Sequence, residues 1–160
     1  MNKFPRSAYV HIPFCHRRCF YCDFAVIPLG NKVETLQGYG SKTVKEYLHF
    51  LYKEILSIKH KSSLSTIYVG GGTPSILDPQ QIKQLIDLFK ENYGVDYGAE
   101  ITMEVDPASF NLDDLHGFIN AGINRFSLGV QSFNNQILQK SGRRHLREDA
   151  EKSCLWLKKV

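Results

Sequence analysis

The chain alternates four times between segments typical of a strand and segments typical of a helix. Short apolar runs rich in β-branched and aromatic residues are each followed by a stretch in which apolar residues recur every three or four positions. The expected strands are residues 7–12, 66–69, 100–105 and 125–130, and the expected helices are 43–58, 79–93, 111–122, 134–140 and 148–159. Repeated βα units favour parallel strands, right-handed crossovers and helices packed outside the sheet. Two α/β architectures remain: an open doubly wound sheet and part of a barrel.

Residues with known capping preferences mark the bounds of two of these helices. Asp78 followed by Pro79 suits the N-cap and first turn of the second helix. Asn111 opens the third helix, and Gly122 ends it because glycine readily adopts the left-handed conformation of a helix C-terminus. The glycine-containing stretch 28–42, ahead of the first helix, is predicted to be a loop.

The composition is that of an ordinary globular protein. Of the 160 residues, 42% are hydrophobic and 22% charged, and the net charge is +4. The basic excess gathers at residues 140–147 and 158–159 without interleaved aromatic side chains, which favours a solvated face over a nucleic-acid-binding surface. No signal peptide or membrane-spanning stretch is recognised, so we expect a cytoplasmic protein with free thiols, and we leave peripheral membrane contact open.

Three cysteines follow the first expected strand with the spacing C-x3-C-x2-C. Cys15, Cys19 and Cys22 could supply three of the four ligands of one iron–sulfur cube, which would leave one iron open to a small molecule. The alternative is a structural zinc module with His11 or His16 as the fourth ligand. Zinc modules usually present two separated ligand pairs, whereas Cys154 lies far along the chain, where we expect a buried or half-buried side chain on a helix. The spacing favours the cluster and keeps zinc as the alternative.

The other polar motifs fall at the ends of the expected strands. A glycine-rich loop, residues 70–74, follows the second strand, Glu104 and Asp106 end the third, and Gln131 follows the fourth. The carboxyl ends of parallel strands meet at one edge of the sheet, so these residues and the cysteines should surround one crevice. Each motif alone is weak evidence, since a glycine triplet is often only a tight turn. Their shared placement predicts a binding site.

Together, these motifs resemble those of the radical S-adenosylmethionine (SAM) superfamily. The cysteine loop and the Gly-Gly-Gly-Thr-Pro loop are its most recognisable marks. Within it, the chain is similar to the branch that contains the oxygen-independent coproporphyrinogen III oxidases and the HemW-type heme chaperones. The segments that support this resemblance are residues 9–15, 69–75, 104–107, 129–133 and 142–145. The resemblance implies part, about four parallel strands, of a (β/α)6 partial TIM barrel, and it leaves little weight on the zinc module.

The sequence around the third cysteine distinguishes two kinds of protein in this branch. The oxidases tend to have a fourth cysteine two positions beyond the third and an extension ahead of the first strand. In this chain Asp23 and Phe24 follow Cys22, and the first expected strand begins at about residue 7. The resemblance therefore implies a HemW-like chaperone that binds heme and delivers it to apo-proteins. An oxidase that decarboxylates coproporphyrinogen through a 5′-deoxyadenosyl radical stays the alternative, so enzymatic activity is left open.

The resemblance also implies cofactors and partners. Cys15, Cys19 and Cys22 should hold a [4Fe–4S] cluster whose open iron is chelated by SAM. The residues expected around the cluster and SAM are Tyr9, Tyr21, Gly71, Gly72, Thr73, Glu104, Gln131 and Arg143. In this scheme Glu104 binds the positively charged part of SAM, and Arg143 pairs with its carboxylate. Heme or a porphyrinogen, an electron donor and an acceptor apo-hemoprotein are the implied partners.

Two histidines near these motifs receive no assignment as heme ligands. His11 is expected to make hydrogen bonds beside the cysteine loop, and His145 is as compatible with a helix cap as with a ligand. The relatives implied by the resemblance continue through two further βα units and a C-terminal domain. Residues 1–160 are therefore expected to form a truncated radical SAM core domain whose unpaired edge strand would reduce its stability.

Overall fold

Four parallel strands form one sheet in a computed structural model that describes residues 4–30, 39–58 and 62–160. The strands are β1 (Ser7–Ile12), β4 (Leu64–Gly71), β5 (Val95–Val105) and β6 (Arg125–Leu128). They lie side by side in chain order, β1-β4-β5-β6, and every neighbouring pair is parallel. This order has no reversal point, so it is that of a barrel wall and not of a doubly wound sheet. The expected partial barrel is confirmed, and the wall does not close within the described residues.

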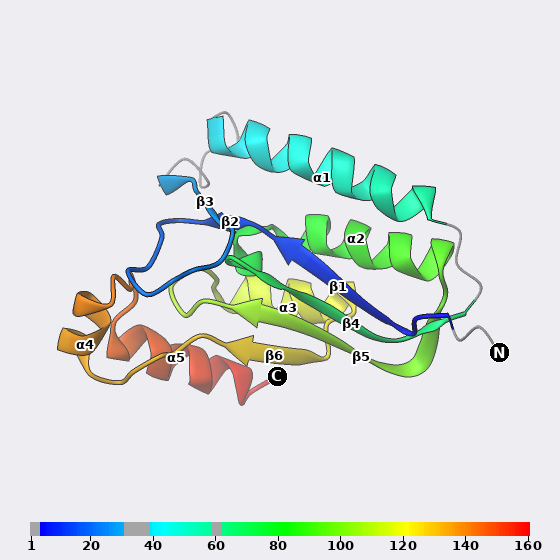
Figure 1. Ribbon diagram of the computed structural model, residues 1–160. Coiled ribbons are helices and arrows are strands. Elements are labelled where there is room, and N and C mark those ends of the chain that lie inside the picture. The colour runs from blue at the N-terminus through cyan, green and yellow to red at the C-terminus, as the bar shows by residue number, and fades with distance from the viewer. Residues whose placement is uncertain (1–3, 31–38, 59–61) are drawn as a thin grey trace.

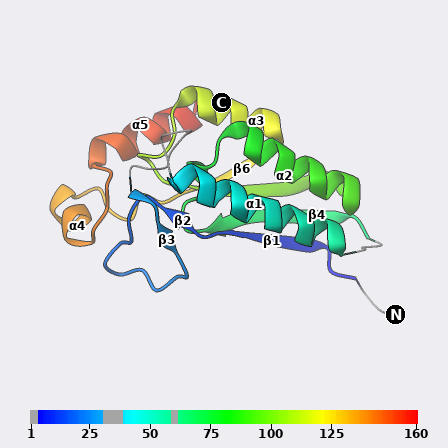
Figure 2. The ribbon, with the colours of Figure 1, turned by 90° about the horizontal axis from the view of Figure 1, so that it is seen from above.

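Helices follow the strands as the sequence predicts. They are α1 (Tyr39–Ser57), α2 (Pro79–Asn92), α3 (Leu112–Ala121), α4 (Asn135–Lys140) and α5 (Arg147–Leu157). The first three cover one face of the sheet, as two perpendicular views show (Figures 1 and 2). Asp78 and Asn111 cap α2 and α3 with their side chains, and Gly122 ends α3 with φ +109°, so these predicted bounds are confirmed. None of the described helices is long and apolar enough to cross a membrane.

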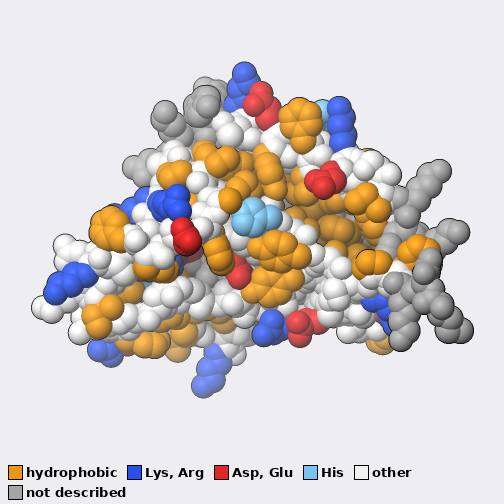
Figure 3. Space-filling view, in the orientation of Figure 1, with side chains coloured by type: hydrophobic (Ala, Val, Ile, Leu, Met, Phe, Trp, Pro, Cys, Tyr) orange, Lys and Arg blue, Asp and Glu red, His pale blue; other side chains and the backbone are white. Residues whose placement is uncertain are grey.

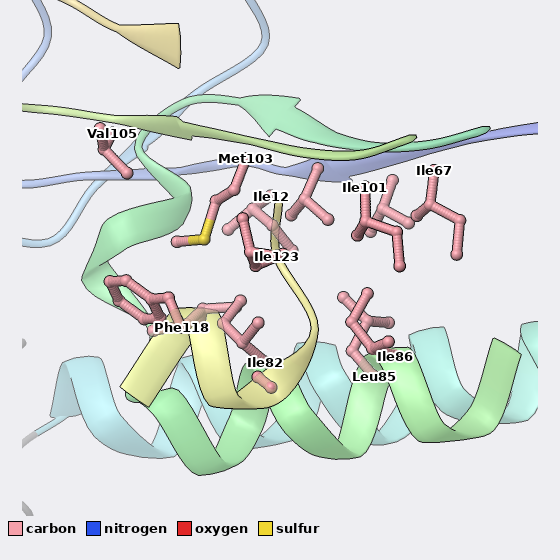
Figure 4. Packing of buried hydrophobic residues seen from close by; sticks show 14 of the residues in the cluster. Ile12, Ile67, Ile82, Leu85, Ile86, Ile101, Met103, Val105, Phe118 and Ile123 are labelled. Atoms are coloured by element: carbon pink, nitrogen blue, oxygen red, sulfur yellow. The ribbon is translucent and has the colours of Figure 1, made fainter. Parts of the chain in front are cut away.

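The hydrophobic core lies between the sheet and these helices. Side chains of the strands, such as Ile12, Ile67 and Met103, point toward the layer of helix side chains that includes Ile82 of α2 and Phe118 of α3 (Figure 4). All five are at most 1% exposed. Burying an aliphatic or aromatic side chain of this size contributes roughly 1.5–3 kcal/mol, so this layer fixes which face of each strand turns inward.

The opposite face of the sheet is more polar, because successive strand residues point to opposite sides. On β1, Tyr9 and His11 point to this face, whereas Val10 and Ile12 are buried under the helices. Tyr68 and Glu104 continue the same face on β4 and β5, where they are hydrogen-bonded. Seen from the front, hydrophobic side chains gather over β1 and up to α1, with charged groups around them (Figure 3).

Several bounds differ from the sequence predictions. The first helix begins at Tyr39 and not at residue 43, while residues 31–38 of the predicted loop lie outside the described residues. The fourth strand ends at Leu128, two residues before its predicted end, because the backbone then makes two tight turns. In these turns Val130 N–H donates to Leu128 O, and Ser132 N–H donates to Val130 O. Cys154 is exposed on α5, so the expectation that it is buried or half-buried was wrong. The buried side of α5 is instead formed by Ala150 and Ser153.

Candidate functional site

The cysteine loop leaves β1 and is closed by two very short strands. Strand β2 (Phe14–Cys15) pairs in parallel with β3 (Ile27–Pro28), a pairing that the sequence did not predict. Backbone bonds from Ile27 N–H to Pro13 O (2.6 Å) and from Leu29 N–H to Cys15 O (2.8 Å) hold the closure. The chain between them contains the second and third cysteines, so local pairing brings all three thiols into one loop at the carboxyl end of β1.

One cavity of about 330 Å³ lies beneath this loop, at the carboxyl ends of the strands. Its lining includes all three loop cysteines together with nearly every residue that the sequence placed around them. These are Cys15, Cys19, Cys22, Tyr21, Gly71, Gly72, Thr73, Glu104, Gln131 and Arg143. Only Tyr9, of the predicted site residues, does not line it. The structure therefore brings residues from four strand ends around a single space.

The thiols are arranged to receive a positively charged group. Burial raises the pKa of Cys15, and the nearby Cys22 and Cys19 raise it further, while Thr73 Oγ1, which donates to Cys15 Sγ at 3.5 Å, opposes the rise. Like charges on neighbouring thiolates disfavour ionisation, and a bound cationic centre favours it. No three His, Cys, Asp or Glu side chains among the described residues converge tightly enough to hold a single metal ion. Three cysteine thiols that line one cavity match the number and type of ligands that hold a [4Fe–4S] cluster with one open iron.

Glycines let the second loop approach the cysteine loop closely. Gly72 N–H donates to Ile12 O at 2.8 Å, and Thr73 N–H donates to Phe14 O at 2.7 Å. A Cβ on Gly72 would lie 2.6 Å from Phe14 O and 3.0 Å from Cys15 Sγ. At Gly71, φ is +113°, and a Cβ would lie 2.7 Å from the His11 ring. The space next to Cys15 thus exists only because the loop has no side chains there.

Glu104 is held in a fixed position at the wall of the cavity. Tyr68 OH donates to Oε1 at 2.8 Å, and Gly71 N–H donates to Oε2 at 3.1 Å. Tyr9, 60% exposed, stacks on Tyr68 with 6.0 Å between ring centroids, and its OH lies 3.1 Å from His11 Nδ1. Tyr9 is therefore a neighbour of the group that orients Glu104, and its predicted contact with the cluster and SAM stays a prediction.

His11 makes two hydrogen bonds beside the cysteine loop, as expected from the sequence. Its Nδ1 faces Tyr9, and its Nε2 lies 3.1 Å from Ala25 O, within the loop. The histidine thus ties β1 to the segment that returns from the third cysteine. Both ring nitrogens are occupied by protein groups in this arrangement.

Arg143 reaches into the cavity from the turn between α4 and α5. Its Nη2 pairs with Asp106 and donates to Gly129 O at 2.8 Å, while Nη1 lies 3.5 Å from Tyr21 OH and 3.7 Å from Cys19 Sγ. Desolvation lowers the pKa of Arg143, but Asp106 above all, then Tyr21 and Cys19, outweigh it and raise the pKa overall. Its Nε is buried and has no hydrogen-bond partner among the described residues. A buried donor of this kind fits a ligand acceptor in the cavity.

Asp106 and His145 belong to this site in ways that the sequence did not reveal. Asp106 was noted only as a residue of the rim, and the structure makes its carboxylate the partner of Arg143. His145 is fully buried and does not cap α5, whose N-cap residue is Leu146. The helix-cap alternative for His145 was therefore wrong. The sequence signal that could have indicated the role of His145 is its spacing of two residues from Arg143. The structure leaves the intervening Arg144 exposed.

Comparison with known sequences gives relatives of two kinds. The chain is 41% identical to the heme chaperone HemW of Synechocystis over 93% of its length, and 38% identical to HemW of Lactococcus lactis over 98%. It is also 40% identical to the oxygen-independent coproporphyrinogen III oxidase of Salmonella typhimurium over 83% of its length. These matches cover 35%, 38% and 28% of the respective relatives, so the chain spans about a third of their length.

A solved structure and a family model agree with these relatives. Coproporphyrinogen III oxidase (HemN) from Escherichia coli, described as a radical SAM enzyme, superimposes with a TM-score of 0.78 and 33% identity, covering 96% of this chain and 34% of that one. The model of the radical SAM superfamily matches residues 9–160. That family implies a [4Fe–4S] cluster and SAM, which the donor set around the cavity fits. Because the family model spans all but the first eight residues, the chain belongs to the radical SAM superfamily.

Proposed function

We propose that this chain is the cluster- and SAM-binding part of a HemW-type heme chaperone. The observation that supports it best is the cavity in which three thiols meet Glu104 and Arg143. Two of the relatives described above are named heme chaperones, and the residues after the third cysteine, Asp23 and Phe24, supply no fourth thiol of the kind expected in the oxidases.

Each side chain then has a defined task. Cys15, Cys19 and Cys22 hold the cluster, which together with SAM supplies one-electron reductive chemistry when bound. Glu104, already oriented by two donors, accepts hydrogen bonds from the ammonium group of SAM. Arg143 donates its unpaired Nε to the carboxylate of SAM while Asp106 keeps the guanidinium in place.

A second candidate is a coproporphyrinogen oxidase. Identity to the Salmonella oxidase, 40%, is close to the 41% found for the Synechocystis chaperone, and the HemN fold is shared. The polar sheet face that continues from Glu104 through Tyr68 to Tyr9 would offer such an enzyme a surface for a substrate beside the cavity. The two candidates share the cluster and SAM and differ in what happens to the tetrapyrrole.

One anaerobic experiment separates them. The chain is reconstituted with iron and sulfide, titrated with heme while the Soret band is followed, and incubated with reductant and SAM with or without coproporphyrinogen. A chaperone should bind heme stoichiometrically and form no additional 5′-deoxyadenosine when coproporphyrinogen is added. Coproporphyrinogen-dependent formation of 5′-deoxyadenosine would refute the chaperone proposal in favour of the oxidase, and a chain that assembles no cluster would refute both.

A further inference from the structure

The turn that follows β6 has an unusual backbone conformation. Gln131 has φ +62° and is the one non-glycine residue with a positive φ in the described part of the chain. Ser132 N–H donates to Val130 O at 2.7 Å, a bond across a single residue. A positive φ with this bonding defines a classic γ-turn, which is rare and strained. Strained conformations persist only where the surroundings impose them, and this one sits where Gln131 lines the cavity.

Two side chains from the α4–α5 turn bind the carbonyls just ahead of Gln131. Arg143 Nη2 donates to Gly129 O at 2.8 Å. His145 Nε2 lies 2.9 Å from Val130 O, the same oxygen that accepts the γ-turn bond. The histidine is fully buried, so this contact is shielded from water and competes with no solvent bond.

The partners of His145 place a proton on Nε2. Its Nε2 lies 2.9 Å from Val130 O, and because a carbonyl oxygen can only accept, Nε2 must be the donor. Its Nδ1 lies 3.3 Å from Arg143 Nη2 and 3.9 Å from Asp106 Oδ1. The imidazole therefore binds the carbonyl on which the strained turn closes, and it lies beside the guanidinium group that Asp106 and Gly129 O hold.

We infer that His145 is a positioning residue for the SAM site: it stabilises the strained turn that presents Gln131 to the cavity, beside Arg143. The inference rests on the proposed function in that SAM is the ligand concerned. His145 does not line the cavity and acts only through its neighbours. Asp106 supports the same arrangement through its pair with Arg143, and its Oδ1 also lies 3.9 Å from His145 Nδ1.

The test compares three variants of the purified chain. His145→Leu removes the donor, and His145→Gln places an amide near the position of Nε2. Ser153→Ala is the matched control, because it removes an equally buried donor, from Ser153 Oγ to Pro107 O at 3.1 Å, outside the cavity. SAM affinity is measured by calorimetry on cluster-loaded protein, and amide hydrogen exchange of residues 129–133 is measured on cluster-free protein.

His145→Leu should weaken SAM binding about three- to tenfold, the range expected for one buried hydrogen bond, and speed exchange in residues 129–133 by a similar factor. His145→Gln should restore both values, while Ser153→Ala should leave both unchanged and bound iron should stay constant throughout. If His145→Leu does not fold, His145→Asn replaces it, since its shorter amide reaches only the position of Nδ1.

Unchanged SAM affinity in the variants that lack the Nε2 donor would overturn the inference, as would an equal effect of Ser153→Ala. Exchange that is no faster in residues 129–133 would also overturn it. This last measurement needs neither cluster nor SAM. A wild-type chain that loads its cluster but binds no SAM would therefore refute the proposed function, and the exchange data would still decide whether His145 holds the turn.

Discussion

Replacing Gly72 by alanine should disturb the fold and the cluster site together. The added methyl group would lie 2.6 Å from Phe14 O, 3.0 Å from Ile12 O and 3.0 Å from Cys15 Sγ. The two oxygens belong to the backbone and cannot rotate away. They also accept the hydrogen bonds from Gly72 and Thr73 that join the glycine loop to the cysteine loop. The methyl group must therefore push apart the two segments that form the wall next to Cys15.

The size of the effect follows from these distances. Ordinary contact begins near 3.4 Å, so Phe14 O must retreat by 3.4 − 2.6, about 0.8 Å, which weakens both backbone bonds. Each bond contributes about 0.5–1.5 kcal/mol, and overpacking a well-packed site costs about 1–3 kcal/mol. Because relieving the clash is what breaks the bonds, the two costs overlap. We expect the free energy of unfolding to fall by about 2–4 kcal/mol, out of the roughly 5–15 kcal/mol of a typical domain.

Urea unfolding of the cluster-free chain under reducing conditions measures this loss, and iron and sulfide analysis after reconstitution measures the accompanying loss of cluster. Gly129→Ala is the matched control, since its methyl group would meet its nearest neighbours at 3.5–3.6 Å and its φ is not positive. If Gly72→Ala were within about 0.5 kcal/mol of this control, a spread typical of neutral substitutions, the reasoning about the close contact would be refuted.

Three further predictions concern single side chains. Cys19→Ser should lose most of the bound iron and sulfide, whereas Cys154→Ser, at an exposed position on α5, should keep it; equal iron in both would argue against the three-thiol site. Glu104→Gln keeps the shape of the side chain but removes its charge, so SAM binding measured by calorimetry should weaken about 10- to 100-fold, and an unchanged affinity would exclude Glu104 as the ammonium acceptor. Burial, with a smaller effect of Asp78, raises the pKa of Tyr52 from 10.0 to about 12. The folded state therefore favours the protonated phenol, whose contribution to stability is complete below pH 10 and is lost as the pH rises toward 12. Tyr52→Phe should therefore reduce the loss of stability in that window, as followed by urea midpoints at several pH values, and an identical pH profile would contradict this assignment.

The helices and strands were predictable where the signal is local. Asp78, Asn111 and Gly122 act within one turn of their own helices, so a single sequence suffices to place them. The end of β6 is different, because the turn after it is closed by Arg143 and His145, which come 14 and 15 residues later than the carbonyls they bind. The predicted burial of Cys154 was wrong for a related reason. An apolar side chain on a helix is buried only if it lies on the same face of the helix as the buried positions, here Ala150 and Ser153.

The cavity was predictable because it follows from topology. Once the strands are parallel, their carboxyl ends must meet, and the cysteine loop, the glycine loop, Glu104 and Gln131 meet with them. Tyr9 shows the limit of that rule. It comes three residues before the end of β1, and its side chain points to the polar face of the sheet. It therefore lies beside Tyr68 and not in the cavity.

The Asp106–Arg143 pair was not predicted: the resemblance singled out Arg143 as a partner of the SAM carboxylate, but no local pattern in the sequence links it to Asp106, 37 residues earlier. Only the fold buries this guanidinium and leaves that of Arg144 exposed. Burial then determines the chemistry: a buried charge without a partner costs several kcal/mol, so Arg143 requires Asp106 whether or not a ligand is present. That pairing uses one edge of the guanidinium and leaves Nε without a partner among the described residues. If Arg143 binds the SAM carboxylate as proposed, the pair with Asp106 leaves Nε as the donor for that contact, even though the charge of Asp106 would repel the ligand.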